Sequence, residues 1–438
     1  MNRRRGCLIL CVTALCCTAP AQEGADGFVT DFTGGVEIPL VKRGDYVLRG
    51  AALVQYQGKA DAVHIPEDLG ITAIGDNVFA ESHIRSVVIP EGVTTIGARA
   101  FFDCYNLGSV SIPKTVTRIG DNAFTGGRVA EIRVDRANAA YAERGGVLFT
   151  RNFSTLIRYP AGKEETEYTV PAGVTRIGAG AFSGCEKLVS VRLPAGLVNI
   201  GDCAFYGCES LRAIKLPESL TGIGDEAFFW CSSLRTLTLP ENLAGAGRGA
   251  FYGCEGLVSV EIPASLTVIG DDAFSECGNL TAFRVDRNNA VYAERDGVLF
   301  NKAIGKLVRY PPKKAGSTYT VPGGIIRIGD DAFEECKNLV SVLLPEGLTG
   351  IDNYAFYGCT NLRSVKLPQS LAGIGRSVFY GCESLQSIDL PALTPPGLGI
   401  WALTHSPAII KVPAAALNAY KNAPGWKDYA GRIQAAED

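Results

Sequence analysis

Hydrophobic positions recur along this chain in a unit of 22 to 24 residues. One copy, GDCAFYGCESLRAIKLPESLTGIG, spans residues 201–224. Within it Ile214 and Leu216 alternate with Ala213 and Lys215. This period of two predicts a β-strand with one buried face. The proline that follows has no N–H for further ladder bonding, so it is expected to end the strand.

The residue that ends this strand allows the repeat to be followed along the chain. It is proline in most copies and aspartate in two, at Pro66, Pro90, Pro113, Asp135, Pro171, Pro194, Pro217, Pro240, Pro263, Asp286, Pro322, Pro345, Pro368 and Pro391. The spacing is 22 to 24 residues except after each aspartate, where it is 36. A fixed period of this length predicts a solenoid of about 14 coils, in which each coil buries its apolar face against its neighbours.

The rest of the unit predicts a second short strand and a buried aromatic spine. The segment LTGIG is read as extended, with Gly224 at a tight corner of positive φ. The dipeptide AF or VF then places a phenylalanine in the core of each coil. These residues are expected to stack into a spine: Phe79, Phe101, Phe124, Phe182, Phe205, Phe228, Phe251, Phe274, Phe333, Phe356 and Phe379.

Nine cysteines follow the spine at a fixed distance of three residues: Cys104, Cys185, Cys208, Cys231, Cys254, Cys277, Cys336, Cys359 and Cys382. Parallel side chains on coils about 4.8 Å apart keep their Cβ atoms too far apart for disulfides. Zinc needs converging ligands, and neither paired C-x₂-C motifs nor suitable histidines accompany these cysteines. They are therefore interpreted as a structural ladder of buried thiols. Cys203 occupies a different slot, and we expect its thiol to be accessible.

Two long coils carry related inserts, at residues 136–167 and 287–318. Their GVLF and LIRYP or LVRYP segments predict the two strands of a hairpin. A trimmed version of this hairpin at residues 46–66 is expected to cap the first coil. The domain reading is a signal peptide at 1–21, an N-terminal extension and cap at 22–62, the repeat solenoid at 63–391 and a C-terminal cap at 392–438.

Charge and the N-terminus indicate export. The net charge is −3, and a mildly acidic chain without a basic tail is a poor candidate for nucleic-acid binding. MNRRRG followed by an apolar stretch too short to span a bilayer predicts a signal peptide, with the mature chain beginning at Gln22. The alternative is a lipid anchor at Cys16 or Cys17. No later run of 18 apolar residues is present.

Three segments together resemble one family. AFYGCESLRAIKLPESLTGIG, the insert YAERDGVLFNK with LVRYPP, and the closing VPAAALNAYKNAPGWKDYA are similar to the BspA-like, or treponemal-type, bacterial leucine-rich repeats. The resemblance implies a β-rich (α/β) leucine-rich repeat solenoid with right-handed coils and a parallel sheet on its concave face. It also implies a cell-surface, secreted or periplasmic protein of a bacterium, and characterised members act as adhesins.

Catalytic motifs are missing, so the sequence indicates a binding protein. It contains no phosphate loop, HExxH or GxSxG motif, and its three histidines are scattered. No catalytic, metal or cofactor residue is therefore assigned, and no cofactor is expected. The outward strand positions carry cations that form a candidate basic stripe: Arg133, Arg192, Arg212, Lys215 and Arg235. Such a stripe could receive an acidic segment of a partner, although it could also serve only to keep the sheet soluble.

Two functions remain open from the sequence. The first is an adhesin that binds a protein or glycan ligand, such as host extracellular matrix, through its concave sheet. The second is a non-catalytic scaffold of the cell envelope or periplasm. Leucine-rich repeats carry many different ligands, so the fold alone does not decide between them.

Overall fold

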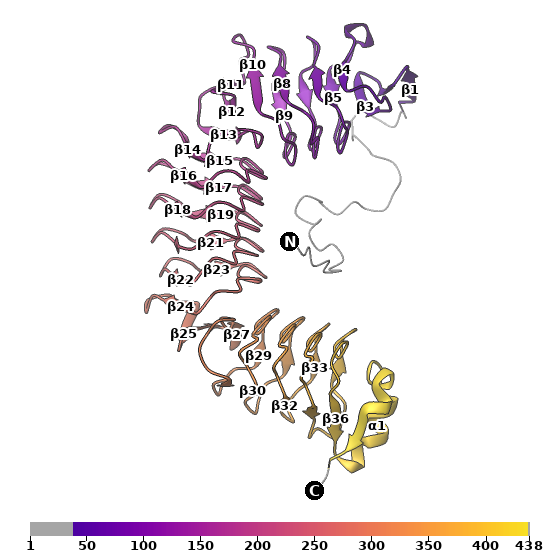
Figure 1. The fold of residues 1–438 in the computed structure, drawn as a ribbon, viewed down its shortest axis with the longest axis vertical. Helices are drawn as coiled ribbons and strands as arrows, with labels where there is room; N and C mark the ends of the chain where they lie inside the picture. Colours follow the sequence, from indigo (N-terminus) through magenta and orange to yellow (C-terminus); the bar gives the residue numbers. More distant parts are fainter. Residues whose placement is uncertain (1–37, 437–438) are drawn as a thin grey trace, which may run out of the picture.

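The computed structural model describes residues 38–436 as an array of short β-coils that bends into an open arc (Figure 1). The array has about 17 turns and few helices. It is the β-rich repeat solenoid that the period predicts. The leader, the expected start at Gln22 and the candidate lipid sites Cys16 and Cys17 lie outside the described residues.

Two series of parallel strands run along the array. The A series contains the strands of the LxxVxLP pattern, at β4 (Ala62–His64), β6 (Ser86–Val88), β8 (Ser109–Ile112), β10 (Glu131–Val134), β14 (Glu167–Thr169), β16 (Ser190–Arg192), β18 (Ala213–Lys215), β20 (Leu237–Thr238), β22 (Ser259–Ile262), β24 (Ala282–Val285), β28 (Thr318–Thr320), β30 (Ser341–Leu343), β32 (Ser364–Lys366), β34 (Ser387–Asp389), β36 (Ile409–Val412) and β37 (Ile433–Ala435). The B series contains the shorter strands, at β5 (Ala73–Ile74), β7 (Thr95–Ile96), β9 (Arg118–Ile119), β15 (Arg176–Ile177), β17 (Asn199–Ile200), β19 (Gly222–Ile223), β21 (Gly245–Ala246), β23 (Val268–Ile269), β29 (Arg327–Ile328), β31 (Gly350–Ile351), β33 (Gly373–Ile374) and β35 (Gly397–Leu398). As predicted, Ile214 of β18 is buried between the exposed Ala213 and Lys215.

A three-stranded antiparallel meander begins each B sheet. The three meanders are β1 (Leu40–Arg43), β2 (Tyr46–Arg49) and β3 (Ala52–Tyr56); β11 (Tyr141–Arg144), β12 (Val147–Thr150) and β13 (Thr155–Arg158); and β25 (Tyr292–Arg295), β26 (Val298–Asn301) and β27 (Lys306–Arg309). The last strand of each pairs in parallel with the next B strand, β3 with β5, β13 with β15 and β27 with β29. The inserts are therefore rungs of the solenoid wall.

The hydrophobic core is divided at the same two places into three clusters. They run from Leu48 to Leu148, from Val147 to Leu299 and from Val298 to Ile433. Figure 1 shows the arc changing direction near β11–β13 and again near β25–β27. We call these places junction 1 and junction 2, and the three stretches that they separate blocks 1, 2 and 3.

The coil count exceeds the expected 14 because the A sheet continues past Pro391. Strand β36 pairs with β34, and β37 pairs with β36, all in parallel. The last rungs are covered by η2 (Ala414–Ala416), α1 (Leu417–Asn422) and η3 (Trp426–Arg432), while η1 (Glu67–Leu69) lies near the other end. Trp426 Nε1 donates to the Pro396 carbonyl at 2.7 Å, so this aromatic residue closes the array.

The phenylalanine spine is confirmed, and each block starts its spine with a tyrosine. Neighbouring phenylalanine rings within a block are nearly parallel, with Phe182 and Phe205 4.8 Å apart between centroids. Tyr159 of the first insert stacks on Phe182 at 5.4 Å, and Tyr310 of the second stacks on Phe333 at 5.2 Å. The insert therefore supplies the first ring as well as the first B strand of its block.

The cysteine ladder is structural, as predicted, and its thiols bond to the spine backbone. The thiol of Cys208 donates to the Phe182 carbonyl at 3.1 Å, and that of Cys231 donates to the Phe205 carbonyl at 3.2 Å. All ten cysteines among residues 38–436 are free and buried. Each ladder thiol thus ties its coil to the preceding one, by a bond to a carbonyl such as that of Phe182, which also accepts the backbone N–H of Cys185 at 3.1 Å.

Two local expectations are wrong. Cys203 is fully buried, because its short side chain lies between closely stacked coils, where the Cys203 N–H bonds to the Asp225 carbonyl of the next coil. The corner glycine Gly224 is not in the left-handed region; the left-handed residue is Glu226, at φ 53°. Gly224 is needed for close packing instead, because an added Cβ would lie 2.6 Å from the backbone nitrogen of Asp202.

Candidate functional site

Four of the five predicted cations lie together on neighbouring coils. Arg192 of β16 and Lys215 of β18 are register partners in a parallel pair. The backbone N–H of Arg235 donates to the Arg212 carbonyl at 3.1 Å, so these two residues also lie on adjacent coils. All four side chains are exposed, and no ion pair within residues 38–436 includes them. We call these four residues the basic patch.

Arg133 does not belong to the basic patch. It lies in β10, the last strand of the A sheet of block 1, while β14 begins a separate A sheet beyond junction 1. Its Nη2 is 2.7 Å from Glu131 Oε2, so a neighbouring carboxylate pairs with its charge. From the spacing of the repeats, Arg133 was expected to be a near neighbour of the other cations. The spacing does not show that the sheet is interrupted between β10 and β14.

The basic patch lies on the outer side of the arc. Figure 1 shows β16 and β18 on the outer side and β17 and β19 on the inner side of block 2. The parallel sheet on the concave side is therefore the B sheet, and the expectation that the predicted cations line the concave face is wrong. Bends at the two junctions turn the B side inward, and the repeat period alone does not encode those bends.

A buried asparagine holds the chain at each junction. Asn138 Nδ2 donates to the carbonyls of Pro113 and Val116, at 2.8 and 2.9 Å, while its Oδ1 accepts from the backbone N–H groups of Ala140 and Tyr141. Asn289 makes the same four bonds at junction 2. The shared DRxNAxYAER motif was the sequence signal, but it was not recognised as a fully satisfied buried amide.

A tyrosine hydroxyl completes the last B strand before each junction. The Ile119 N–H donates to Tyr141 Oη at 2.8 Å, and the Ile269 N–H donates to Tyr292 Oη at 2.9 Å. The hydroxyl takes the place of a backbone carbonyl from a further strand. Each block therefore has a defined end as well as a defined beginning.

The LIRYP and LVRYP segments place a buried arginine at each junction. Arg158 is 2% exposed and Arg309 is 3% exposed. In both, Nη1 donates to a backbone carbonyl of the following coil, that of Gly180 for Arg158 and that of Asp331 for Arg309. Sequence reasoning missed both residues. The available signal was the period of two, because each arginine follows a buried leucine, Leu156 or Leu307, by two residues on the same strand face.

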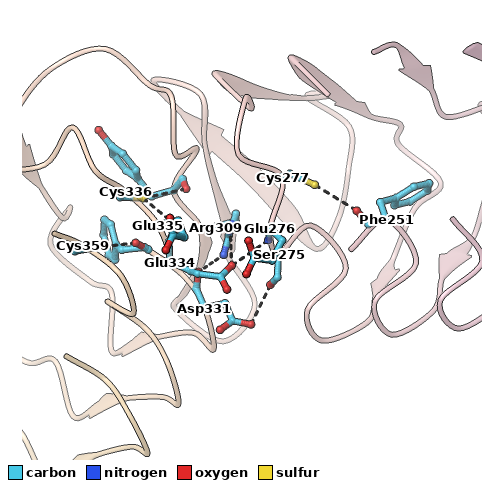
Figure 2. Close-up of polar contacts among 12 residues, drawn as sticks. Phe251, Ser275, Glu276, Cys277, Arg309, Asp331, Glu334, Glu335, Cys336 and Cys359 are labelled. Atoms are coloured by element: carbon cyan, nitrogen blue, oxygen red, sulfur yellow. Dashed lines mark hydrogen bonds and ion pairs between the residues drawn. The ribbon is translucent and has the colours of Figure 1, made fainter. Parts of the chain in front are cut away.

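At junction 2 the arginine has carboxylate partners. Arg309 Nη2 donates to Glu334 Oε2 at 3.1 Å, and the backbone N–H of Glu276 donates to the same oxygen at 3.0 Å. Ser275 donates to Asp331 Oδ2 at 3.0 Å. Figure 2 shows these side chains meeting between the coils of blocks 2 and 3. The ion pair of Arg309 with Glu334 meets the requirement that a buried charge be neutralised and hydrogen-bonded.

At junction 1 the equivalent carboxylates are missing. Ser183 stands at the position of Glu334, and Gly180 stands at the position of Asp331, each 151 residues earlier. Nε and Nη2 of Arg158 are covered and have no hydrogen-bond partner within residues 38–436. Burial lowers the pKa of Arg158. Burial also acts to lower the pKa of Arg309, but Glu334 and Asp331 outweigh it and raise that pKa.

A cleft opens at both junctions, and the one at junction 1 is larger. It has a volume of about 540 Å³, and Asn122, Thr125, Arg158 and Asp202 are among its lining residues. The cleft at junction 2, which Arg309 lines, has a volume of about 160 Å³. The junction with the unpaired arginine is therefore also the one whose cleft has the larger volume.

The acidic residues at junction 2 raise one another's pKa. Burial and the nearby charges of Glu334 and Glu335 together raise the pKa of Glu276 to about 7, although Arg309 acts to lower it. Burial likewise raises the pKa of Asp331, with Glu334 adding to the effect. The carboxylates of this cluster outnumber its one cation, Arg309. Glu276 and Asp331 therefore release their protons at a higher pH than exposed carboxyl groups do.

Residues 38–436 contain neither a metal site nor a membrane-spanning helix. No group of three or more histidine, cysteine or acidic side chains there is arranged to hold a metal ion. No helix within that range is long and apolar enough to cross a bilayer.

The repeats decide the family. A model of the BspA type leucine rich repeat region matches residues 56–142, 161–281 and 314–396, in six copies. The chain belongs to the BspA-type leucine-rich repeat family. No curated protein sequence matches this BspA-type chain.

Several solved structures are similar to this BspA-type protein. A leucine rich cell surface protein from Faecalibacterium prausnitzii is 24% identical, with 88% of this chain and 98% of that one covered and a TM-score of 0.47. A leucine-rich repeat protein from Bacteroides ovatus is 22% identical, with 94% and 100% covered and a TM-score of 0.37. The pneumococcal vaccine antigen PcpA is 17% identical, with 92% and 98% covered and a TM-score of 0.44. All three TM-scores are below 0.5, so the family rests on the repeat match and not on these structures.

Proposed function

We propose that this BspA-type protein is an exported, non-catalytic binding protein of the cell surface, an adhesin whose basic patch receives an acidic segment of a protein or glycan. Membership of the BspA-type family and the signal-peptide pattern before Gln22 support export. The basic patch supports the binding role. Its partner class follows from charge, because exposed cations without carboxylate neighbours attract anionic groups.

The observation that carries the proposal is the pairing of Arg192 with Lys215. Two like charges at register positions of adjacent strands repel each other and weaken the sheet. Carboxylates pair with cations on other coils, as Glu261 does with Arg284 at 3.8 Å. Opposite charges on adjacent strands would keep the sheet equally soluble. Solubility alone therefore does not explain two cations side by side at this position.

The testing experiment measures binding of the chain from Gln22 onward to immobilised fibronectin, fibrinogen and laminin. The patch variant changes Arg192, Arg212, Lys215 and Arg235 to Ser. We expect saturable binding to at least one protein that weakens with salt and falls at least tenfold in the patch variant, since screening and charge removal act on the same attraction.

A matched control removes four other exposed cations and leaves the patch intact: Arg287→Ser, Arg363→Ser, Lys366→Ser and Lys411→Ser. Both variants change the net charge by the same amount, so a general charge effect would weaken both equally. Such an equal effect would contradict the assigned surface. Absence of binding to every ligand would favour the envelope scaffold over the adhesin, and fractionation of intact cells would then locate the protein.

A further inference from the structure

Junction 1 has a buried arginine like that of junction 2, but it lacks the carboxylate that pairs with the arginine there. At junction 2 the Glu334 carboxylate lies between Arg309 Nη2 and the backbone N–H of Glu276. The same fold places Arg158 at junction 1, with Ser183 where Glu334 would stand. The two junctions thus form a natural comparison in one chain, with one buried arginine paired by the protein's own carboxylate and the other without such a partner.

Arg158 borders the junction 1 cleft. The residue is 2% exposed, it lines this cleft of about 540 Å³, and its covered Nε and Nη2 have no hydrogen-bond partner among residues 38–436. An unpaired buried cation costs several kcal/mol, so a ligand that neutralises it gains correspondingly. Guanidinium groups present planar pairs of N–H donors that fit carboxylates, often with two parallel bonds.

We propose that the junction 1 cleft binds a carboxylate on a slim alkyl chain, which pairs with Arg158 as Glu334 pairs with Arg309. The ligand is either a small free acid or the glutamate side chain of a peptide, because both present the group that junction 2 holds. This inference does not depend on the basic patch, which lies on the A sheet of block 2 and uses other residues.

The mouth of the cleft indicates how large the rest of the ligand is. Asp121 and Asp202 line it together with Arg176. The Asp202 carboxylate already accepts the N–H of Asp225 at 2.9 Å, so it is partly engaged. A mouth with mixed charge suits a short ligand that carries a polar group at its far end. It does not suit a polyanion, which would meet both aspartates.

The test is titration calorimetry at neutral pH with glutarate, with a blocked peptide that contains one glutamate, and with inorganic phosphate. We expect one saturable site for glutarate or the peptide, whichever is the source, and at least tenfold weaker binding of phosphate. Phosphate binding as tight as glutarate would overturn the carboxylate assignment. Absence of binding by glutarate and the peptide would overturn the site itself.

The decisive variant is Ser183→Glu, which gives Arg158 an internal carboxylate as at junction 2. It should abolish glutarate binding and raise the melting temperature, because the protein then neutralises its own buried cation. Glutarate binding that survives in S183E would place the ligand elsewhere and overturn the proposal.

The converse variant opens junction 2. Glu334→Ser combined with Asp331→Gly removes both carboxylates from Arg309, and the stoichiometry for glutarate should rise from one to two. A folded variant that still binds one equivalent would contradict the pairing rule. If this variant does not fold, S183E tests the proposal without it.

Discussion

Arg192 and Lys215 stand side by side on adjacent parallel strands, as register partners, with no ion pair to either side chain within residues 38–436. Like charges at such positions weaken a sheet. We therefore expect Lys215→Glu to stabilise the fold, by about 0.5 kcal/mol, while it weakens binding of an acidic partner. Urea unfolding and the binding assay would be measured on the same preparation.

The two readouts of K215E separate the proposed functions. If K215E is more stable but loses binding, the repulsion between Arg192 and Lys215 is a cost of keeping both cations available to a ligand. Lys366→Glu, at the equivalent position in block 3, is the matched control because the residue opposite it in β30 is Leu343. Its other register partner, Asp389 of β34, carries the opposite charge, so K366E should leave binding unchanged while it lowers stability. A loss of binding there would shift the surface to block 3.

The ladder thiols should not react in the folded protein. Burial raises the pKa of Cys254 and Cys359 well above the ordinary value and that of Cys277 to about 12, so little thiolate is present at neutral pH. We expect a thiol reagent to label none of the ten cysteines of the chain from Gln22 within minutes, and all ten in guanidinium.

A surface cysteine serves as the positive control for that labelling. Lys215→Cys places a thiol at an exposed position of β18 and should react at once in the folded protein. Rapid labelling of Cys203 in the native chain would contradict the observed burial of that side chain.

Stability should fall as the pH rises through the range in which Glu276 titrates. Its pKa in the folded state is about 7, above the ordinary value of 4.5, so the folded chain binds more protons between these limits. Stability is therefore fully present below about pH 4.5 for this group and is lost towards pH 7, by about 1–3 kcal/mol. Urea midpoints at pH 5.5 and 7.5 would measure the change.

Glu276→Gln isolates this contribution. The substitution removes the titrating group but keeps the backbone N–H that donates to Glu334. The difference between the two pH values should shrink in E276Q, although Glu334 and Asp331 still titrate nearby. An unchanged difference would assign the pH dependence to another part of the chain.

The junction asparagines should be costly to replace. Asn138→Ala leaves the Pro113 and Val116 carbonyls and two N–H groups without their partner, all in a buried place. We expect a loss of about 2–4 kcal/mol in the free energy of unfolding. Asn242 makes one exposed bond, to the Glu218 carbonyl, and Asn242→Ala should cost less than about 0.5 kcal/mol. Similar losses in the two variants would contradict the role of the junction amide.

Much of the fold follows from the sequence because each coil repeats the same local environment. The burial of Ile214, the stacking of Phe182 on Phe205 and the inward thiol of Cys208 all follow from one pattern applied many times. Gly224 was correctly placed at a corner but for the wrong reason, because the space available there is set by the preceding coil.

The candidate sites were harder to predict because they depend on the places where the repeat breaks. Arg133 is separated from Arg192 by junction 1, which the count of coils does not reveal. Arg158 lies two residues after Leu156, on the buried face of β13, but an arginine is rarely found buried and was therefore not expected there. The sequence difference between Ser183 and Glu334 could be interpreted only once the structure showed that Glu334 pairs with the buried Arg309.

The matching junctions make the middle of this molecule removable. Asn138 and Asn289 hold their chains by the same four hydrogen bonds, and Tyr141 and Tyr292 close the preceding sheet in the same way. Deleting residues 139–289 would join Asn138 to Ala290 and rebuild a junction of this kind from block 1 and block 3. The span of the arc is thus adjustable in steps of one block, and a shortened chain would move the two ends of the molecule relative to each other while both keep their own surfaces.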